Sequence, residues 1–308
     1  MYKFLLLLKL LLFFSFTNNS LSNIEIKYKV DEEIITNLDI ENEKKYLVFL
    51  RPNLVNLNEK EITQISKNSL IREIIKKEEI NKIFKEKKDL EFLNQIKKNL
   101  FKFKRVKNEE EFKNLIYRNK IDYDKILEKM KNEALWNELI YRKYSRMVRI
   151  DREKLKQKLI DNLSNNKKFM YNLSELLFEV KNTENLQVKY NNILNYVKEY
   201  DFKSASSRFS IANSAEKGGQ IGWVKETLLS ENLNIILNKM SLGEISKPIK
   251  YPNGYLILKI NDKQEMDQNI DIDKELKELI NYETNKQLNQ FSLLYFKKLK
   301  QNSKINEY

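Results

Sequence analysis

The stretch KGGQIGWVKETLLSENLNIILNKMSLGEISKPIKYPNGYLILKIND, residues 217–262, decides the fold that we predict for this chain. It contains all five glycines of the 308 residues, two of the three prolines and one of the two tryptophans. Glycine is needed where φ is positive or where two backbone segments approach closely. The stretch is therefore expected to have the most demanding backbone of the chain, at Gly218, Gly219, Gly222, Gly243 and Gly254.

The residues around these glycines predict a compact α+β unit. Residues 172–180 (NLSELLFEV) indicate a strand, and Pro252-Asn253-Gly254 is a hairpin signal between two further strands. The predicted elements are a strand at 172–180, helices at 184–200 and 202–213, a turn with a short strand at 218–224, a helix at 230–240, and strands at 245–249 and 255–260. Their order is β-α-α-β-α-β-β.

The rest of the chain is predicted to be mostly helical. A strand pair at 24–36 comes first, and Asn58 with Glu61 has capping-box spacing at the start of one helix. The polar segment 164–168 predicts a domain boundary, and a polar tail follows the last helix. The apolar stripe around Trp136 indicates core packing, with a peptide-binding groove as the alternative. The predicted helices outside the α+β unit span 38–49, 58–84, 89–103, 108–117, 122–147, 152–163 and 273–300.

The composition excludes several classes of function. The chain has no cysteine, which excludes disulfides and thiolate chemistry, and no histidine, which excludes histidine-ligated zinc hydrolases and Ser-His-Asp enzymes. The net charge is +13, but the basic residues are interleaved with glutamate, and a bias toward Lys, Asn and Ile explains them as well as a polyanion partner does. We therefore predict no nucleic-acid partner, no metal and no cofactor.

The first residues indicate export. Residues 1–22 have a positive start at Lys3, an apolar run and small residues at Ser20-Leu21-Ser22, which is typical of a cleaved signal peptide. The apolar run is short for a membrane span of about 20 residues. We expect a periplasmic protein with no stable membrane insertion after cleavage, and an uncleaved anchor is the alternative.

The glycine-rich stretch resembles the parvulin-type (PpiC) peptidyl-prolyl isomerases. The strings GGQIGW, GEISKPI and GYLILK match that family's motifs in order and spacing, over about residues 172–262. The upstream layout is similar to that of the SurA chaperones. The resemblance implies a mostly helical SurA-like body, with one small antiparallel sheet flanked by helices and a C-terminal helix packing on the N-terminal part.

The resemblance also implies which residues form the substrate-binding site. It implies a proline slot lined by Ile221, Leu229 and Leu233, for which ordinary core packing is the alternative, with Ser214 nearby. The family's two histidines fall at Glu175 and Leu256, and its acid or cysteine falls at Ala212. An alternative for Glu175 is a solvent-facing strand residue. The predicted structural motif residues are Gly218, Gly219, Gly222, Trp223, Gly243, Pro248 and Gly254.

Isomerisation of an X-Pro bond needs no covalent chemistry, only tighter binding of the twisted amide than of the planar forms. We predict a periplasmic chaperone that binds unfolded polypeptides, above all outer-membrane proteins, with weak or lost isomerase activity. An active peptidyl-prolyl isomerase is the alternative. The predicted division is a signal peptide at 1–22, a SurA-like helical domain at 23–165, a parvulin-like domain at 170–263 and the C-terminal helix at 270–308.

Overall fold

The computed structural model describes residues 23–84, 90–163, 168–181, 183–266 and 271–308. The predicted signal peptide and most of the predicted boundary at 164–168 lie outside these residues. Within them the chain is mostly helical with two small antiparallel sheets, so the predicted α+β class is confirmed.

The first part of the chain, called the helical body here, runs from β1 to α7. Its hairpin of β1 and β2 passes directly into α2, where Thr36 and Asp39 form a reciprocal capping box. Asn58 caps the next long helix by accepting from the amide of Glu61, without the reciprocal bond. The elements are β1 Ile26–Val30, β2 Glu33–Thr36, α2 Asn37–Leu50, η1 Pro52–Asn56, α3 Glu59–Ile83, α4 Leu90–Lys104, α5 Glu109–Arg118, α6 Tyr123–Tyr144, η2 Ser145–Met147 and α7 Arg152–Leu163.

The second part, called the sheet unit here, runs from β3 to β6 and has the predicted order of elements. Its sheet has the strand order β4-β3-β6-β5, and all neighbours are antiparallel. The elements are β3 Phe169–Phe178, α8 Leu186–Glu199, α9 Phe202–Phe209, η3 Asn213–Lys217, β4 Gln220–Lys225, η4 Glu226–Leu228, α10 Glu231–Asn238, β5 Ile249–Tyr251 and β6 Gly254–Glu265.

Each face of this sheet has its own core. On one face Leu176 and Phe178 of β3 pack against α8 and α9. On the other face Leu173 and Leu177 pack with α10, and Tyr282 from the far end of the chain joins them. Burial on both faces explains the uninterrupted apolar run Leu176-Leu177-Phe178 at the end of β3.

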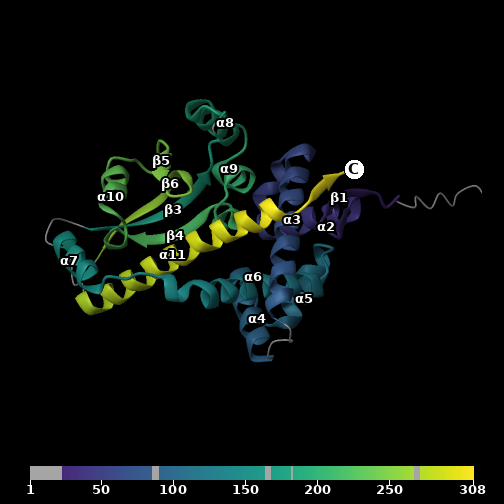
Figure 1. Cartoon of the computed structure of the whole chain (residues 1–308), viewed down its shortest axis with the longest axis horizontal. Helices are drawn as coiled ribbons and strands as arrows, with labels where there is room; N and C mark the ends of the chain where they lie inside the picture. Colours follow the sequence, from purple (N-terminus) through teal and green to yellow (C-terminus); the bar gives the residue numbers. More distant parts are fainter. Residues whose placement is uncertain (1–22, 85–89, 164–167, 182, 267–270) are drawn as a thin grey trace, which may run out of the picture.

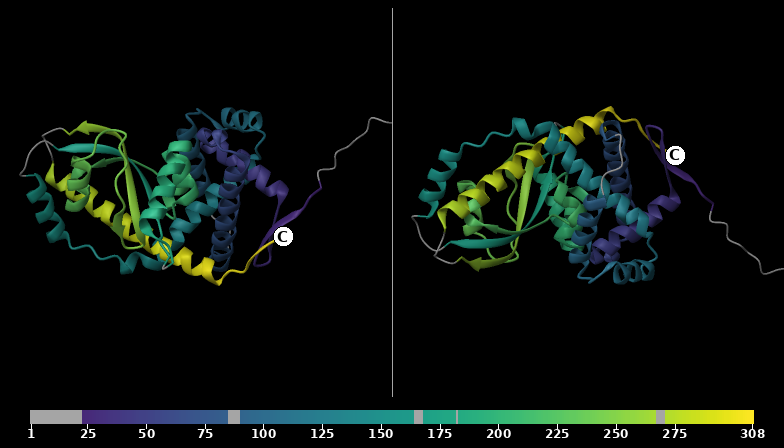
Figure 2. Two further views of the ribbon diagram at one scale, coloured as in Figure 1. Left: turned by 90° about the horizontal axis from the view of Figure 1, so that it is seen from above. Right: turned by 90° about the horizontal axis from the view of Figure 1, so that it is seen from below.

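The long helix α11, Ile272–Asn302, crosses both parts of the molecule. Figure 1 shows it running from α7 at one end, past the sheet, to α3 at the other, and Figure 2 shows the same course from above and below. Its first turns pack with α7 and η4 around Leu276 and Leu279, and its later turns pack against α3 and α6. The helix therefore ties the sheet unit to the helical body.

Three predicted elements differ from the structure. The helix predicted over 202–213 ends at Phe209 and is followed by the separate turn η3. The strand predicted from Ile245 begins at Ile249, and Ile245 makes an isolated bridge, because Pro248 offers no amide hydrogen to a ladder. The predicted polar tail contains a strand, β7 Ile305–Glu307, which pairs with β1. Among the described residues, no helix is both long enough and apolar enough to cross a membrane.

Candidate functional site

Gly219, the second glycine of the motif, lies in close contact with β3 and α9. Gly219 (φ +76°) lies so close to β3 and α9 that a Cβ atom would be 2.2 Å from the carbonyl oxygen of Glu175 and 2.5 Å from Oγ of Ser206. Its own carbonyl accepts from the amide of Glu175 at 2.8 Å, and Ser206 donates to the carbonyl of Glu175 at 3.0 Å. This close approach sets the position of Glu175 relative to the following strand, β4.

A small cavity, called the slot here, lies between the sheet, α10 and α11. Its volume is about 130 Å³. It is lined by five of the residues that the sequence singled out: Glu175, Ile221, Leu229, Leu233 and Leu256. Leu229 is almost fully buried, whereas Ile221 is 40% exposed at the rim. The structure thus brings these residues together, and their role as substrate-binding residues stays a prediction.

One polar feature of the slot is a carboxyl group that is paired with a hydroxyl group. Ser214 donates from Oγ to Oε1 of Glu175 at 2.7 Å. Burial raises the pKa of Glu175, and the hydrogen bond from Ser214 offsets part of that effect. Glu175 is therefore not an ordinary solvent-facing strand residue. Ala212 and Leu256, at the other two family positions, are buried in the apolar core and offer no polar side chain.

The far wall of the slot comes from residues that the sequence did not single out. Tyr282 and Lys286 of α11 line it, together with Tyr251 of β5. Burial raises the pKa of Tyr282 to about 12, and the hydroxyl of Tyr251 and the carboxylates of Glu283 and Glu175 add to the effect. Sequence reasoning missed Tyr282 because it lies off the apolar stripe of α11, and no local signal identifies which helix will cover a slot more than 100 residues from β3.

The beginning of α11 is held against the slot by polar contacts. Glu275, which is buried, accepts from Oγ1 of Thr227 at 3.0 Å and pairs with Lys225. Lys225 also pairs with Glu278 at 2.6 Å. These contacts connect α11 to β4 and η4, the elements that follow the glycine motif, and they stabilise the arrangement in which the helix lines the slot.

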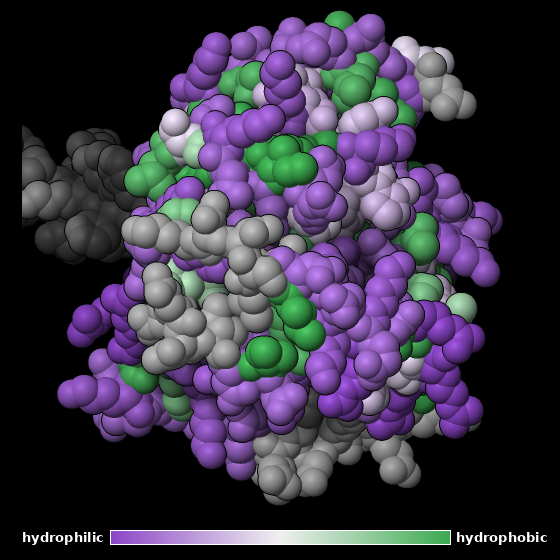
Figure 3. Space-filling model, turned by 90° about the vertical axis from the view of Figure 1, so that its left-hand side faces the viewer, coloured by the Kyte–Doolittle hydropathy of each residue, from purple (hydrophilic) through white to green (hydrophobic). Residues whose placement is uncertain are grey.

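The surface around the sheet unit is mostly polar. Figure 3 shows the end of the molecule that carries α7 and α10, where hydrophobic residues form separate patches in a largely hydrophilic surface. Large exposed apolar side chains of the sheet unit include Trp223, Ile235 and Leu242. Trp223 of the predicted motif therefore lies at the surface of β4. Within the part of the chain that the structure describes, no group of acidic side chains is arranged to hold a metal ion.

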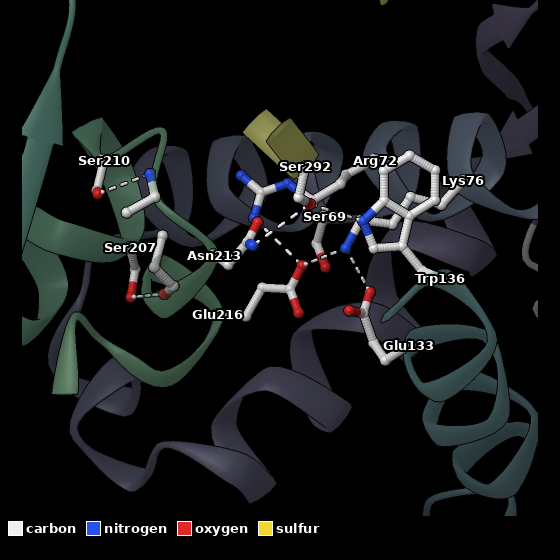
Figure 4. A network of polar contacts seen from close by, with 12 residues as sticks. Ser69, Arg72, Lys76, Glu133, Trp136, Ser207, Ser210, Asn213, Glu216 and Ser292 are labelled. Atoms are coloured by element: carbon white, nitrogen blue, oxygen red, sulfur yellow. Dashed lines mark hydrogen bonds and ion pairs between the residues drawn. The ribbon is translucent and has the colours of Figure 1, made fainter. Parts of the chain in front are cut away.

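A second cluster of polar residues joins the sheet unit to the helical body. Figure 4 shows Glu216 of η3 facing Arg72 and Lys76 of α3, with Glu133 of α6 beside them. Glu216 pairs with Arg72 at 3.2 Å and with Lys76 at 3.5 Å, and Lys76 also pairs with Glu133 at 2.7 Å. Burial by itself raises the pKa of Glu216, but the charges of Lys76, Arg72 and Arg51 outweigh it and lower the pKa to about 2.

Replacing Glu216 by alanine is expected to lower the free energy of unfolding by about 2 kcal/mol at pH 7. Loss of one partner from a fully buried ion pair costs about 3–5 kcal/mol, but about a third of the Glu216 side chain is exposed and water screens it. Because its folded pKa lies below the ordinary value of 4.5, the stabilisation is complete above that value and is lost as the pH falls toward 2. Urea unfolding at pH 7 and pH 3 measures it.

The matched control is Glu153→Ala, which removes an exposed carboxylate of α7. We expect this variant to stay within about 0.5 kcal/mol of the unmodified protein at both pH values. A Glu216→Ala loss that is the same at pH 3 as at pH 7 would contradict the ionic origin of the stabilisation.

Comparison with known proteins places the sheet unit in a family. A family model described as Rotamase, the PPIC-type PPIase domain, matches residues 170–262. The chain is 25% identical over 169 residues to the chaperone SurA of Pseudomonas putida, a match that covers 52% of this chain and 40% of that protein. It is 38% identical over 88 residues to the chaperone SurA of Buchnera aphidicola, covering 28% of this chain and 20% of that protein.

These matches span well under two thirds of the curated relatives' own length. Among solved structures, one from a study of two SurA-like chaperones of Campylobacter jejuni, PEB4 and Cj1289, is 18% identical, covers 92% of this chain and 98% of its own, and superposes with a TM-score of 0.39. Residues 170–262 belong to the PpiC-type peptidyl-prolyl isomerase domain family, and the chain is similar to SurA chaperones over about half of its length.

Proposed function

We propose that this protein is a chaperone of the SurA type that holds unfolded polypeptides, and that its PpiC-type domain has weak or lost prolyl isomerase activity. The observation that carries the second part is the slot itself. Its apolar wall is present, but two of the family's three polar positions hold Ala212 and Leu256, and Tyr282 from α11 covers one side. Such a slot provides apolar contact without the usual polar groups around the amide.

Surfaces for holding a client are available outside the slot. Two larger cavities, of about 510 Å³ and 680 Å³, both include residues of α3. Each combines apolar side chains with charged ones, and each is within the size range of peptide and ligand sites. We propose that both surfaces contact extended clients: the smaller lies within the helical body, and the larger lies between the helical body, the sheet unit and α11.

The location and the clients are part of the same proposal. We propose export by the signal at 1–22, residence in the periplasm, and clients that include outer-membrane proteins. The proposed division of the mature chain is a helical domain over 23–165, the PpiC-type domain over 170–263 and the C-terminal helix over 270–308. Support comes from the SurA relatives and from a further relative, 36% identical over 52 residues, that is named a periplasmic chaperone, PpiD, in Haemophilus ducreyi.

An aggregation assay tests the chaperone function. Urea-unfolded outer-membrane protein is diluted into buffer with or without an equimolar amount of the full chain, and light scattering follows aggregation. We expect the chain to suppress scattering, because clients bound to it cannot associate with each other. Scattering that is unchanged at equal and at fivefold excess concentration of the chain would refute the proposal.

The alternative function, an active prolyl isomerase, is favoured by one specific observation. Glu175 and Ser214 form a hydrogen-bonded pair beside the apolar slot, and Tyr251 and Tyr282 add hydroxyls to its lining. These groups could stabilise a twisted amide without histidine. NMR exchange spectroscopy on an X-Pro peptide separates the two functions, because a cis-trans exchange rate equal to the uncatalysed rate excludes the enzyme.

Opening the slot is expected to increase peptide binding. Tyr282→Ala removes the ring that covers the slot, at a cost of about 2 kcal/mol in stability because the side chain is partly buried. If the uncovered state is populated at about one part in ten, the apparent affinity for an X-Pro peptide rises about tenfold. Fluorescence anisotropy of a labelled peptide measures it. Tyr282→Phe keeps the ring and is expected to bind as the unmodified chain does; equal affinity of all three proteins would show that α11 does not limit access.

A further inference from the structure

The larger of the two cavities beside α3 has an unusual charge balance. This cavity, called the basic groove here, has a volume of about 680 Å³ and lies between α3, α9, α11 and the β5–β6 turn. Among the residues that the structure describes, its lining contains a single carboxylate, Glu179, and six cationic side chains: Arg72, Lys181, Arg208, Lys250, Lys297 and Lys300. The cations come from five different segments, so positive charge is spread along the groove.

The charge of the basic groove is not a simple reflection of the basic composition of the chain. The other large cavity, on the side of α3 formed by Glu73 and Lys77, is lined by seven carboxylates and four lysines of the described part of the chain. Two cavities that share one helix therefore differ in sign. The basic groove therefore favours acidic partners, and the cavity with more carboxylates favours basic ones.

Several cations of the basic groove lack a carboxylate partner. Arg72, Arg208 and Lys297 pair with Glu216, Glu61 and Glu179, respectively. Lys181, Lys250 and Lys300, in contrast, have no carboxylate within ion-pair distance among the residues that the structure describes. Partial desolvation lowers the pKa of Lys300, and the charge of Arg72 lowers it further. An incoming carboxylate would relieve this repulsion.

The groove also has apolar and hydrogen-bonding features that suit a polypeptide better than a small anion. Its lining includes Ile71, Phe209, Ile211, Tyr255, Leu293 and Phe296. The Nδ2 atom of Asn253, at the β5–β6 turn, is buried and has no hydrogen-bond partner among the described residues. An unpaired buried donor of this kind costs free energy until an acceptor, such as a peptide carbonyl or a carboxylate, reaches it.

We propose that the basic groove binds segments of unfolded polypeptide in which acidic residues are interspersed with apolar ones. The proposal rests on the proposed chaperone function and adds a substrate class to one of its surfaces. Apolar side chains of the segment would lie on the aliphatic and aromatic lining, and its carboxylates would pair with Lys181, Lys250 and Lys300. Charge then selects among clients that are equally apolar.

The test uses three labelled peptides with the same apolar residues. In the first the intervening residues are Asp and Glu, in the second Asn and Gln, and in the third Lys. Fluorescence anisotropy with the full chain is expected to give the tightest binding for the acidic peptide, by about tenfold over the amide peptide at low salt. The difference should shrink as salt is raised, because exposed charges are screened. Equal affinities of the acidic and amide peptides would overturn the proposal.

A pair of variants places the effect in the groove. Lys181→Glu with Lys300→Glu is expected to weaken acidic-peptide binding about tenfold and to leave amide-peptide binding within about twofold. Lys98→Glu with Lys107→Glu makes the same change in net charge at exposed sites in the helical body, and should leave both affinities unchanged. An equal loss in both double variants would assign the preference to overall charge and refute the site.

Two further outcomes are distinguished by the same proteins. If size-exclusion chromatography shows a dimer that the Lys181→Glu/Lys300→Glu variant dissociates, a second copy of the chain occupies the groove and the proposal is wrong. If aggregation of unfolded clients is not suppressed but the acidic peptide still binds preferentially, the chaperone function fails while the groove stands. If the chain suppresses client aggregation but binds the acidic and amide peptides equally, the groove proposal is wrong and the chaperone function stands.

Discussion

Replacing Trp136 by alanine is expected to lower the free energy of unfolding by about 3–5 kcal/mol, the cost of emptying the space of a large buried aromatic side chain. Trp136 of α6 is fully buried, and its ring stacks on Tyr295 of α11 with 5.9 Å between centroids. Its Nε1 donates to Oγ of Ser292 at 2.9 Å, also on α11 (Figure 4). Lys76 of α3 lies over the same ring. One side chain therefore joins three helices, and urea unfolding measures its loss.

Ser292→Ala is the matched control for this variant. It removes the hydrogen bond but keeps the ring, so we expect a loss of about 1 kcal/mol. If the two variants were equally destabilised, the indole would contribute through its hydrogen bond and not through packing. Trp136→Ala should also loosen α11 and raise the affinity of the slot for X-Pro peptides, in the same direction as Tyr282→Ala, because the same helix covers the slot.

The second large effect is expected at Gly219. Gly219→Ala should lower the free energy of unfolding by about 3 kcal/mol, the sum of a positive-φ penalty of about 1 kcal/mol and an overpacking penalty of about 2 kcal/mol. A Cβ atom at this position would meet the carbonyl oxygen of Glu175, which belongs to the backbone of β3 and cannot rotate away. We expect the displaced strand to move Glu175 away from Ser214 as well. Thermal or urea unfolding measures the stability.

Gly222→Ala separates the two penalties. Gly222 has φ +88°, similar to Gly219, but a Cβ atom there would have no heavy atom within 4 Å. We therefore expect a loss of only about 1 kcal/mol, from the backbone conformation alone. Similar losses in both variants would mean that the close approach of Gly219 to β3 and α9 does not contribute, and that the glycine motif serves only the turn.

Much of the sheet unit could be predicted from local sequence. The glycines mark the positions of positive φ, and all five adopt it. The turn at Pro252-Asn253 joins β5 to β6 as the hairpin signal indicates, because Gly254 takes a backbone conformation that other residues disfavour. Apolar alternation and capping residues such as Asn58 predict most helices of the body to within a few residues. Each of these signals involves only a few neighbouring residues, so it can be recognised without knowledge of the tertiary structure.

The elements that were predicted wrongly depend on distant partners. Residues 305–307 (Ile-Asn-Glu) are exposed, and they form β7 only because β1 offers an open edge at the other end of the chain. The start of β5 at Ile249 has a local cause instead, because Pro248 has no amide hydrogen for the ladder. An edge strand of two or three residues is too short to show the alternation of apolar and polar side chains that identifies a strand in a sequence.

The candidate site shows the same division. The position of Glu175, Ile221, Leu229, Leu233 and Leu256 around one slot follows from the order of elements and the family motif, so the sequence was sufficient to name them. The sequence did not indicate that Ser214 would donate to Glu175, or that the carboxyl would be partly buried with a raised pKa. Those properties depend on how η3 packs against β3, which Gly219 permits.

Residue types and their near neighbours are enough to predict the glycine-rich turn, the order of strands and helices, and the absence of histidine and cysteine chemistry. Tertiary structure alone decided that α11 would cover the slot with Tyr282, that Glu216 would join Arg72 and Lys76, and that the cations of the basic groove would meet. The physical reason is that packing and charge pairing act through space. Residues such as Lys181 and Lys300, which are far apart in the chain, acquire a common role only when α11 crosses both parts of the molecule.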